Sequence, residues 1–159
     1  MSLTIVMPTI GRESMLHAVW SIANQTVDTD CILQYDPERQ GASLTRNQAV
    51  QRVKTTWVGF CDDDDWLDLR YHQWLNEECE GFDMVIFNMR RPEGIVLPDH
   101  TDVDKLAYNW VGISFALKTA IAKKFPFNNM VGEDYDLIMR VKEAGYKIKI
   151  SERVAYFIG

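Results

Sequence analysis

Short apolar segments alternate with segments of helical periodicity along the front half of the chain. The run "LTIVMPTI" at residues 3–10 is rich in β-branched residues and predicts a buried strand. The runs "CILQYD" at residues 31–36 and "WVGFC" at residues 57–61 predict two more strands. Between them, apolar residues recur at helical spacing from Met15 onward and over residues 43–53. The front half therefore predicts strand, helix, strand, helix, strand.

The rear half mixes clear and irregular segments. Its clearest helix spans residues 133–145, where Leu137, Val141 and Ala144 share one face and Gly145 can cap the end. The other expected helices are at residues 67–79 and 118–124. The expected strands are at residues 83–89, 110–117, 146–150 and 154–158, with a short edge piece at residues 94–97. The segments expected to be irregular are residues 98–104 and 125–132.

The order of these elements predicts the fold class. Alternating strands and helices indicate a parallel α/β sheet with helices on both faces, and 159 residues are the length of one domain, residues 1–159. In such sheets, ligands bind outside the carboxyl ends of the strands. The polar residues after the first three expected strands are Thr9 and Arg12, Asp36, and Asp62 to Asp65. We expect all of them to converge on one edge of the sheet.

Composition and charge narrow the class of ligand. Hydrophobic residues make up 47% of the chain and charged residues 25%, as in ordinary globular proteins. The formal net charge of −6 argues against a nucleic-acid binder, which would carry a basic face. It does not argue against nucleotides, because a divalent metal can reconcile phosphates with acids.

The cysteines and the apolar runs indicate the cellular compartment of the protein. The three cysteines, Cys31, Cys61 and Cys79, form no C-x-x-C pair and give no disulfide framework, so we expect them to be reduced. The start of the chain has no basic segment followed by a long apolar one, so no signal peptide is predicted. No apolar run approaches the length of a membrane span. These features predict a cytoplasmic protein.

The run "VGFCDDDDWL" places four consecutive aspartates directly after a core strand. Mg²⁺ and Mn²⁺ favour oxygen ligands, and residues i and i+2 of an extended segment point the same way. Both Asp62 with Asp64 and Asp63 with Asp65 fit this D-x-D spacing. We favour Asp62 and Asp64 because the apolar run stops at Cys61. The alternative is a solvated acidic turn that caps the helix expected from about Leu67.

Other candidate residues each have a structural alternative. Arg46, near the start of a helix, can meet a phosphate or a base, or can be an ordinary surface arginine. Asp36 can accept hydrogen bonds from a ribose or a base edge, or can form an Asx turn. Glu133 and Asp134 at a helix start can supply a general base, or can simply suit the helix dipole. The irregular segment at residues 125–132 ahead of them could let the site close.

Several other chemistries receive no support. The three histidines, His17, His72 and His100, have no metal-ligand spacing. Neither a G-x-S-x-G motif nor a Walker-type glycine-rich loop is present, which disfavours a serine hydrolase and a P-loop protein.

Four stretches in this order resemble the family-2-type glycosyltransferases of the GT-A fold. They are "TIVMPTIGR", "GASLTRNQAV", "WVGFCDDDDWL" and "GEDYDLIMRVKEAGYKI", and they run from Thr4 to about Ile148. The resemblance implies a GT-A-like (Rossmann-like) α/β fold with a mixed, mainly parallel central sheet and helices on both faces. It implies a hexosyltransferase that uses a nucleotide-sugar donor, usually a UDP-sugar, with Mg²⁺ or Mn²⁺ on the diphosphate and an acceptor hydroxyl. It also implies inverting displacement.

The resemblance assigns roles by position. The second aspartate of the D-x-D is favoured as the direct metal ligand, and Glu133 is the second candidate for the base. The implied nucleotide contacts are Pro8, Thr9, Arg12, Asp36, Arg46 and Asp62. The implied metal ligands are Asp62 and Asp64, and the implied catalytic base is Asp134.

The chain departs from the family in two respects, and alternatives remain open. It is shorter than usual, and it has no histidine after His100, where many relatives carry one that helps to hold the metal. A catalytically weak nucleotide-sugar-binding module or a donor hydrolase is therefore the main alternative. A nucleotidyltransferase would show a glycine-rich loop after the first strand, and "PTIGRES" has one glycine. A calcium loop fits worse, because "DDDDWLDLRYHQ" lacks the required glycine and final acid.

Overall fold

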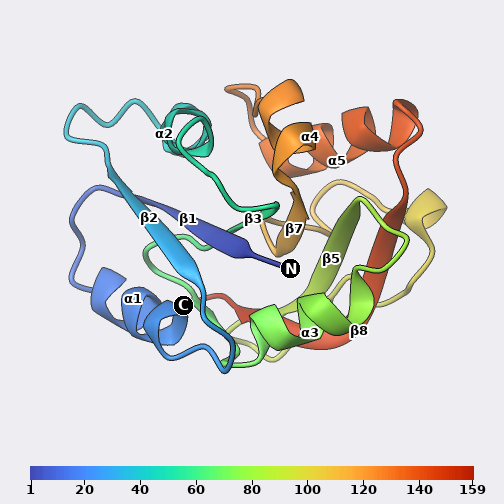
Figure 1. Cartoon of the computed structure of the whole chain (residues 1–159), viewed down its shortest axis with the longest axis horizontal. Coiled ribbons are helices and arrows are strands. Elements are labelled where there is room, and N and C mark those ends of the chain that lie inside the picture. The colour runs from blue at the N-terminus through green and yellow to red at the C-terminus, as the bar shows by residue number, and fades with distance from the viewer.

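The strand β1 (Leu3–Thr9) lies at the centre of the front half of the sheet, and all of its residues are buried (Figure 1). The computed structural model describes residues 1–159. β1 pairs in parallel with β2 (Asp30–Tyr35) on one side and with β3 (Trp57–Phe60) on the other. β1 and β3 are largely apolar because both faces of a central parallel strand are covered. β2 is at the edge of the sheet and is mostly exposed.

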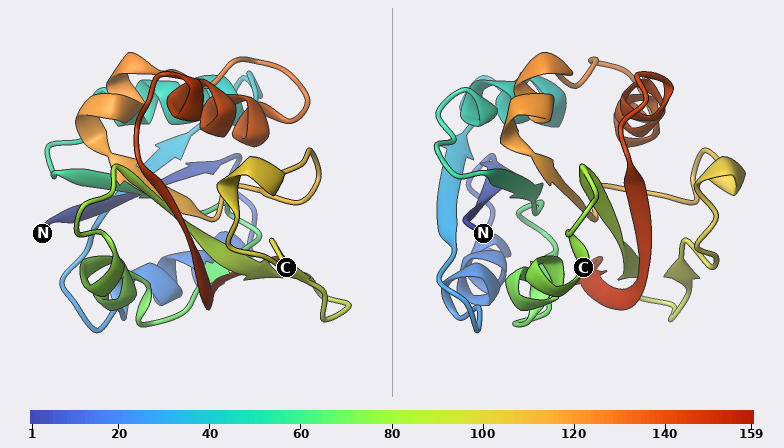
Figure 2. Two further views of the ribbon diagram at one scale, coloured as in Figure 1. Left: turned by 90° about the vertical axis from the view of Figure 1, so that its right-hand side faces the viewer. Right: turned by 45° about the vertical axis from the view of Figure 1, so that its right-hand side comes forward.

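Helices cover both faces of the sheet (Figures 1 and 2). On one face lie α2 (Ala42–Val50), α4 (Thr119–Lys124) and α5 (Glu133–Glu143). On the other face lie α1 (Met15–Ala23) and α3 (Tyr71–Glu78). None of these helices is long and apolar enough to cross a bilayer.

The rear half makes the sheet mixed. β7 (Phe115–Lys118) pairs antiparallel with both β3 and β5 (Met84–Arg90), and β8 (Ile148–Phe157) runs parallel to β5. The short strands β4 (Trp66–Leu67) and β6 (Val96–Leu97) pair antiparallel with β8 and β5. The resulting order is β2-β1-β3-β7-β5-β8-β4, with β6 attached to β5. The predicted GT-A-like α/β fold, with helices on both faces of a mixed sheet, is confirmed.

Apolar side chains from both halves form one continuous core of 36 buried residues. Phe60 of β3, Phe115 of β7 and Phe127 after α4 meet in this core, with ring centroids 5.2 to 6.4 Å apart. The front and rear strands are therefore joined by side-chain packing as well as by the sheet. The expectation that residues 1–159 are a single domain stays a prediction.

The helix expected from residue 67 begins later. Leu67 belongs to β4 and pairs with Tyr156, and the backbone N–H of Leu67 donates to Ser21 Oγ at 3.2 Å. Asp68 then forms a turn, in which its backbone carbonyl accepts from Tyr71 N at 3.0 Å and its side chain accepts from Arg70 N at 2.9 Å. The helix α3 starts after this turn, so the four aspartates Asp62–Asp65, called the acid run below, do not cap it.

Three expected strands in the rear half also differ. The strand expected at residues 110–117 is reduced to β7, because Asn109 has a φ of 69° and the chain to Ser114 forms a loop. The strands expected at residues 146–150 and 154–158 are one strand, β8, with register shifts against β5. Ser151 Oγ accepts from Arg153 N at 3.1 Å, so the polar residues between the two runs make a bulge rather than a turn. The loop expected at residues 98–104 holds one 3-10 turn, Val103–Lys105.

Candidate functional site

The polar residues after β1, β2 and β3 line one cleft of about 330 Å³, as the sequence predicts. The start of α2 completes its lining. The residues that line the cleft are Pro8, Thr9, Ile10, Arg12, Asp36, Arg39, Gly41, Ala42, Thr45, Asp62, Asp63 and Asp64. We call this set the strand-end wall.

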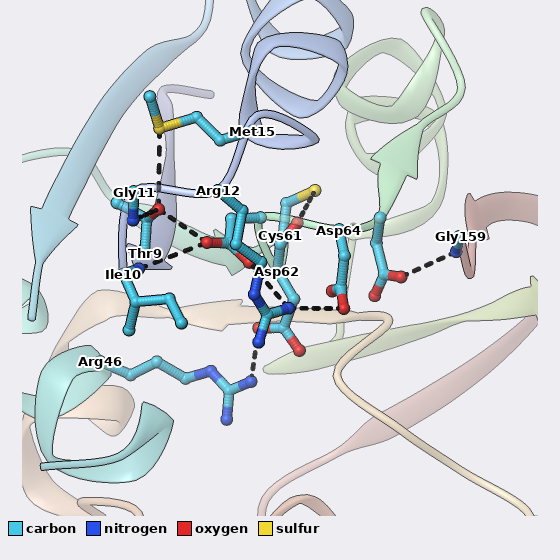
Figure 3. Close-up of polar contacts among 12 residues, drawn as sticks. Thr9, Ile10, Gly11, Arg12, Met15, Arg46, Cys61, Asp62, Asp64 and Gly159 are labelled. Carbon is cyan, nitrogen blue, oxygen red and sulfur yellow. Dashed lines mark hydrogen bonds and ion pairs between the residues drawn. The ribbon is translucent and has the colours of Figure 1, made fainter. Parts of the chain in front are cut away.

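The loop after β1 is bonded to the acid run (Figure 3). Thr9 Oγ1 donates to Asp63 Oδ2 at 2.6 Å, and Gly11 N donates to Thr9 Oγ1 at 2.9 Å. Arg12 Nη1 lies 2.7 Å from Asp64 Oδ2 and 3.3 Å from Asp63 Oδ1. The protein's own hydroxyl and guanidinium groups therefore offset part of the charge that four adjacent aspartates bring together.

The four aspartates alternate between open and buried positions. The side chains of Asp62 and Asp64 are 32% and 50% exposed, whereas that of Asp63 is 7% exposed. Asp65 is buried and accepts from Tyr156 Oη at 2.6 Å and from Gly159 N at 3.0 Å. Burial raises the pKa of Asp65 to about 6. Asp62 and Asp64 are thus the pair that opens to the cleft, and Asp63 and Asp65 fasten the turn to its surroundings.

Asp36 holds the loop between β2 and α2. Its Oδ1 accepts from Gln40 N and its Oδ2 from Gly41 N, both at 3.0 Å, and the backbone bond from Gln40 lowers the pKa of Asp36. The carboxylate thus holds backbone groups four and five residues further along the chain, a structural role that differs from the Asx turn left open by the sequence. Asp36 also lines the cleft, and its contact with a nucleoside stays a prediction.

Arg46 of α2 lies beneath the strand-end wall and is only 2% exposed, so the surface-arginine alternative is wrong. Its Nη2 donates to Asp62 Oδ1 at 2.6 Å and its Nη1 to Glu133 Oε1 at 3.1 Å. Its Nη1 is 4.0 Å from Asp134 Oδ1, and its Cζ lies 5.3 Å from the centre of the Phe127 ring. Arg46 does not line the cleft, and its contact with a nucleotide stays a prediction.

Glu133 and Asp134 open α5 on the other side of Arg46. Gly132 before them has a φ of 78°, a left-handed conformation that favours glycine. A Cβ added at Gly112 would lie 3.9 Å from Asp134 Oδ2, so the loop before β7 runs close to this carboxylate. We call Gly112 and residues 132–134 the helix wall.

Asp134 is a partly buried acid, with a side chain that is 22% exposed and one oxygen that is buried and unpaired. Its Oδ1 has no hydrogen-bond partner. Burial raises the pKa of Asp134 to about 7, the charge of Arg46 opposes that rise, and the charges of Glu133 and Asp62 add to it. A carboxyl group with a pKa near neutrality and a free lone pair suits proton transfer.

The acid run can serve a metal only together with other ligands. No group of three or more His, Cys, Asp or Glu side chains is arranged to hold an ion. Asp62 and Asp64 nevertheless offer carboxylate oxygens at i and i+2 that open to the cleft. Mg²⁺ often takes one or two carboxylates plus substrate phosphates and water. Asp62–Asp65 form a turn rather than the expected extended segment, with Asp65 N donating to Asp62 O at 3.1 Å, and the D-x-D role of Asp62 and Asp64 stays a prediction.

Sequence reasoning missed the supports of the acid run. Tyr156 lies in the apolar run "VAYFI", and its hydroxyl donates to Asp65 and accepts from Asp62 N at 3.1 Å. A buried tyrosine hydroxyl usually has a polar partner, so this tyrosine in a core strand was the available signal. The sequence offers Asp63 and Asp65 only as an alternative metal pair, although in the structure they bind Thr9 and Tyr156 of the protein itself.

Comparisons with known proteins point to the fold. The sequence matches no described protein family, and it matches no curated protein. A crystal structure of S. aureus TarS 1-349 superposes with a TM-score of 0.80 at 15% identity, covering 99% of this chain and 60% of that chain. TarS 1-349 in complex with UDP-GlcNAc also gives 0.80 at 15% identity, covering 99% of this chain and 58% of that one. A197 from STIV gives 0.65 at 16% identity, covering 96% of this chain and 82% of that one.

These likenesses show a shared fold. TarS is a glycosyltransferase, and the common architecture is the GT-A-like fold that the sequence predicts. This chain spans about 60% of the length of the TarS 1-349 chain. The TarS structures include complexes with UDP and with UDP-GlcNAc.

Proposed function

We propose that the protein binds a nucleotide-diphosphate sugar, a UDP-sugar, and transfers the sugar to an acceptor hydroxyl. The observation that carries the proposal is the placement of two sets of carboxylates on opposite sides of Arg46. Asp62 of the pair that opens to the cleft contacts Arg46 on one side, and Asp134 lies across it on the other. The complexes of TarS with UDP and UDP-GlcNAc support a donor of this class.

The nucleotide is proposed to lie along the strand-end wall. Pro8, Thr9 and Arg12 supply the loop after β1, and Asp36 supplies the loop after β2. Asp62 belongs to this wall and is bonded to Arg46, which also contacts Glu133 of the helix wall. Arg12, at 47% exposure, can turn from Asp64 to a phosphate at little cost, because exposed ion pairs contribute only about 0–1 kcal/mol.

Mn²⁺ or Mg²⁺ is proposed to bind Asp64 and Asp62 together with the diphosphate. When bound, the ion would offset the charge that grows on the leaving phosphate. Asp64 is the freer of the two ligands, since its partner Arg12 is exposed whereas Asp62 is tied to the buried Arg46.

Asp134 is proposed to be the catalytic base. It would accept the proton of the acceptor hydroxyl as that oxygen attacks the anomeric carbon, while UDP leaves from the opposite face, which inverts the product. Its unpaired Oδ1 and its pKa of about 7 favour it over Glu133, whose Oε1 accepts a hydrogen bond from Arg46.

A donor hydrolase or a weak nucleotide-sugar-binding module is the second candidate. It is favoured by the lack of any three-ligand metal cluster and by the arginine partners of Asp62 and Asp64. Turnover separates the candidates: a hydrolase releases free sugar, a binding module releases nothing, and a transferase consumes acceptor.

The first test is calorimetry with a panel of nucleotide sugars in Mn²⁺, Mg²⁺ or EDTA. The proteins are the wild type, Asp64→Ala and the control Asp28→Ala, an exposed aspartate before β2. Metal-dependent binding of one UDP-sugar, lost in Asp64→Ala and kept in the control, is expected. If no nucleotide binds the wild type under any metal condition, the proposal is wrong.

A further inference from the structure

Arg46 joins parts of the molecule that are far apart in sequence. It lies on α2, while its two hydrogen-bond partners are Asp62, 16 residues away, and Glu133, 87 residues away. No other lysine or arginine lies within 4.0 Å of Asp62, Glu133 or Asp134. One buried guanidinium therefore serves carboxylates from both the strand-end wall and the helix wall.

The geometry around Arg46 divides its contacts into two kinds. Nη2 and Nη1 donate to Asp62 and Glu133, which are hydrogen bonds between charged groups. The contact with Asp134 is 4.0 Å long, too long for a hydrogen bond, and Asp134 Oδ1 has no partner. Asp134 thus receives the electrostatic effect of Arg46 but keeps its lone pair free.

This difference matters for a base. A carboxylate oxygen that accepts a hydrogen bond from a guanidinium is a poorer proton acceptor, because its lone pair is already used. A buried carboxylate with no cation nearby would stay protonated at neutral pH, since burial disfavours its charged form. The 4.0 Å separation between Arg46 Nη1 and Asp134 Oδ1 avoids both of these outcomes.

The charged groups that face Asp134 are few. They are Arg46 from α2, Glu133 from its own helix and Asp62 from the acid run. The loop that passes Asp134 at Gly112, residues 106–114, contains no charged side chain. Arg46 is therefore the one cation among these groups, and its charge favours the ionised form of Asp134.

We infer that Arg46 is a positioning residue: it ties Asp62 and Glu133 together and favours the ionised form of Asp134 through space, without a hydrogen bond that would occupy the Asp134 carboxylate. The assignment rests on the proposed function and replaces a nucleotide contact as the role of Arg46. An arginine that is 2% exposed, with both terminal nitrogens bonded to carboxylates, does not face the nucleotide cleft.

The test compares the wild type with Arg46→Met, Arg46→Lys and the control Arg52→Met, an exposed arginine just after α2. The first measurement is a ¹³C NMR pH titration of the Asp134 carboxyl, assigned with Asp134→Asn, without donor or metal. Removing the cation is expected to raise the pKa of Asp134 by about one unit or more in Arg46→Met, a tenfold loss of the ionised form below neutral pH. Arg46→Lys keeps the charge but not the forked geometry, so a smaller rise is expected. Arg52→Met is expected to match the wild type.

The second measurement is UDP affinity, and the third is the transfer rate against pH. In Arg46→Met, the UDP affinity is expected to stay within about threefold of the wild type, because Arg46 is not among the residues that line the cleft. Transfer is expected to fall at pH 6.5 and to recover largely by pH 9, where Asp134 ionises unaided. An arginine that only holds the fold together would lower the rate at every pH.

The outcomes separate the inference from the proposed function. An unchanged Asp134 titration in both variants would overturn the inference, and so would a loss of UDP affinity without a change in that titration. If Arg46→Met does not fold, Arg46→Lys decides in the same way. A wild type that neither binds nor turns over any nucleotide sugar would overturn the proposed function, while the titration would still decide whether Arg46 controls Asp134.

Discussion

The strand-end wall, which lines the cleft, and the helix wall, which lies across Arg46 from it, are built in opposite ways. On the strand-end wall, Thr9, Arg12 and Asp63 are joined by contacts of 2.6 to 3.3 Å, and each side chain has a partner. On the helix wall, Asp134 has an unpaired oxygen. A bonded wall keeps its shape for a ligand, whereas an unpaired buried carboxylate is costly to maintain and is useful where a proton must be taken up.

The largest expected effect comes from removing the unpaired carboxylate. Asp134→Asn is expected to lower transfer by about 10²–10⁴-fold, which is the usual contribution of a general base. UDP affinity should stay within about twofold, because Asp134 lies outside the strand-end wall. The measurements are the steady-state transfer rate and calorimetry.

The matched control is Asp136→Asn. Asp136 is the next acid of the same helix turn, and its carboxylate is already bonded to Arg140 and Asn128. Transfer by this variant should be close to that of the wild type. A normal rate in Asp134→Asn would show that the base lies elsewhere, and Glu133→Gln would be examined next.

The sequence predicts the strand-end wall better than the helix wall. Strand ends are visible as places where an apolar run stops, so the convergence of Thr9, Asp36 and Asp62 followed from the strand order alone. The helix wall depends on the loop before β7, where Asn109 takes a left-handed φ of 69° that no periodicity reveals. The segment expected to be a strand at residues 110–117 follows this turn and is loop up to Ser114.

The burial of Arg46 could not be predicted from the sequence either, and the reason is a different one. On a helix, an arginine with polar neighbours in sequence reads as exposed, and only tertiary packing decides otherwise. The buried guanidinium is tolerated because Asp62 and Glu133 are brought to it from distant parts of the chain. The hydrogen bonds between Tyr156 and the acid run could not be predicted for the same reason, because Tyr156 is distant from these aspartates in sequence.

The second-largest expected effect comes from changing the backbone of the helix wall at Gly132. In Gly132→Ala, the left-handed φ of 78° is strained, and the new Cβ would lie 2.2 Å from Tyr108 Cε2. We expect the free energy of unfolding to fall by about 2–3 kcal/mol, measured by urea denaturation. Gly145→Ala, at the other end of α5, has a φ of 87° but nothing within 4 Å, so it should lose only the backbone strain of about 1–2 kcal/mol. Equal losses would mean that the contact with Tyr108 adds nothing.

The third effect removes a support of the strand-end wall. Tyr156→Phe deletes the hydroxyl that donates to Asp65 and accepts from Asp62 N, leaving both buried groups without this partner. The expected loss of unfolding free energy is about 1–2 kcal/mol. Tyr146→Phe is the control, because its hydroxyl has a single long contact of 3.4 Å with Lys124. If the two variants are equally stable, the acid run does not depend on β8.

The smallest effect concerns Arg12, an exposed arginine that contacts the aspartates after β3. Arg12 and its partner Asp64 are 47% and 50% exposed, so solvent and salt screen their ion pair. Arg12→Ala should change the free energy of unfolding by less than about 1 kcal/mol, whereas its UDP affinity should fall because a phosphate contact is lost. Raising the salt concentration should shrink the already small difference in stability between Arg12→Ala and the wild type. A loss as large as that of Tyr156→Phe would mean that Arg12 fastens the wall rather than serving its ligand.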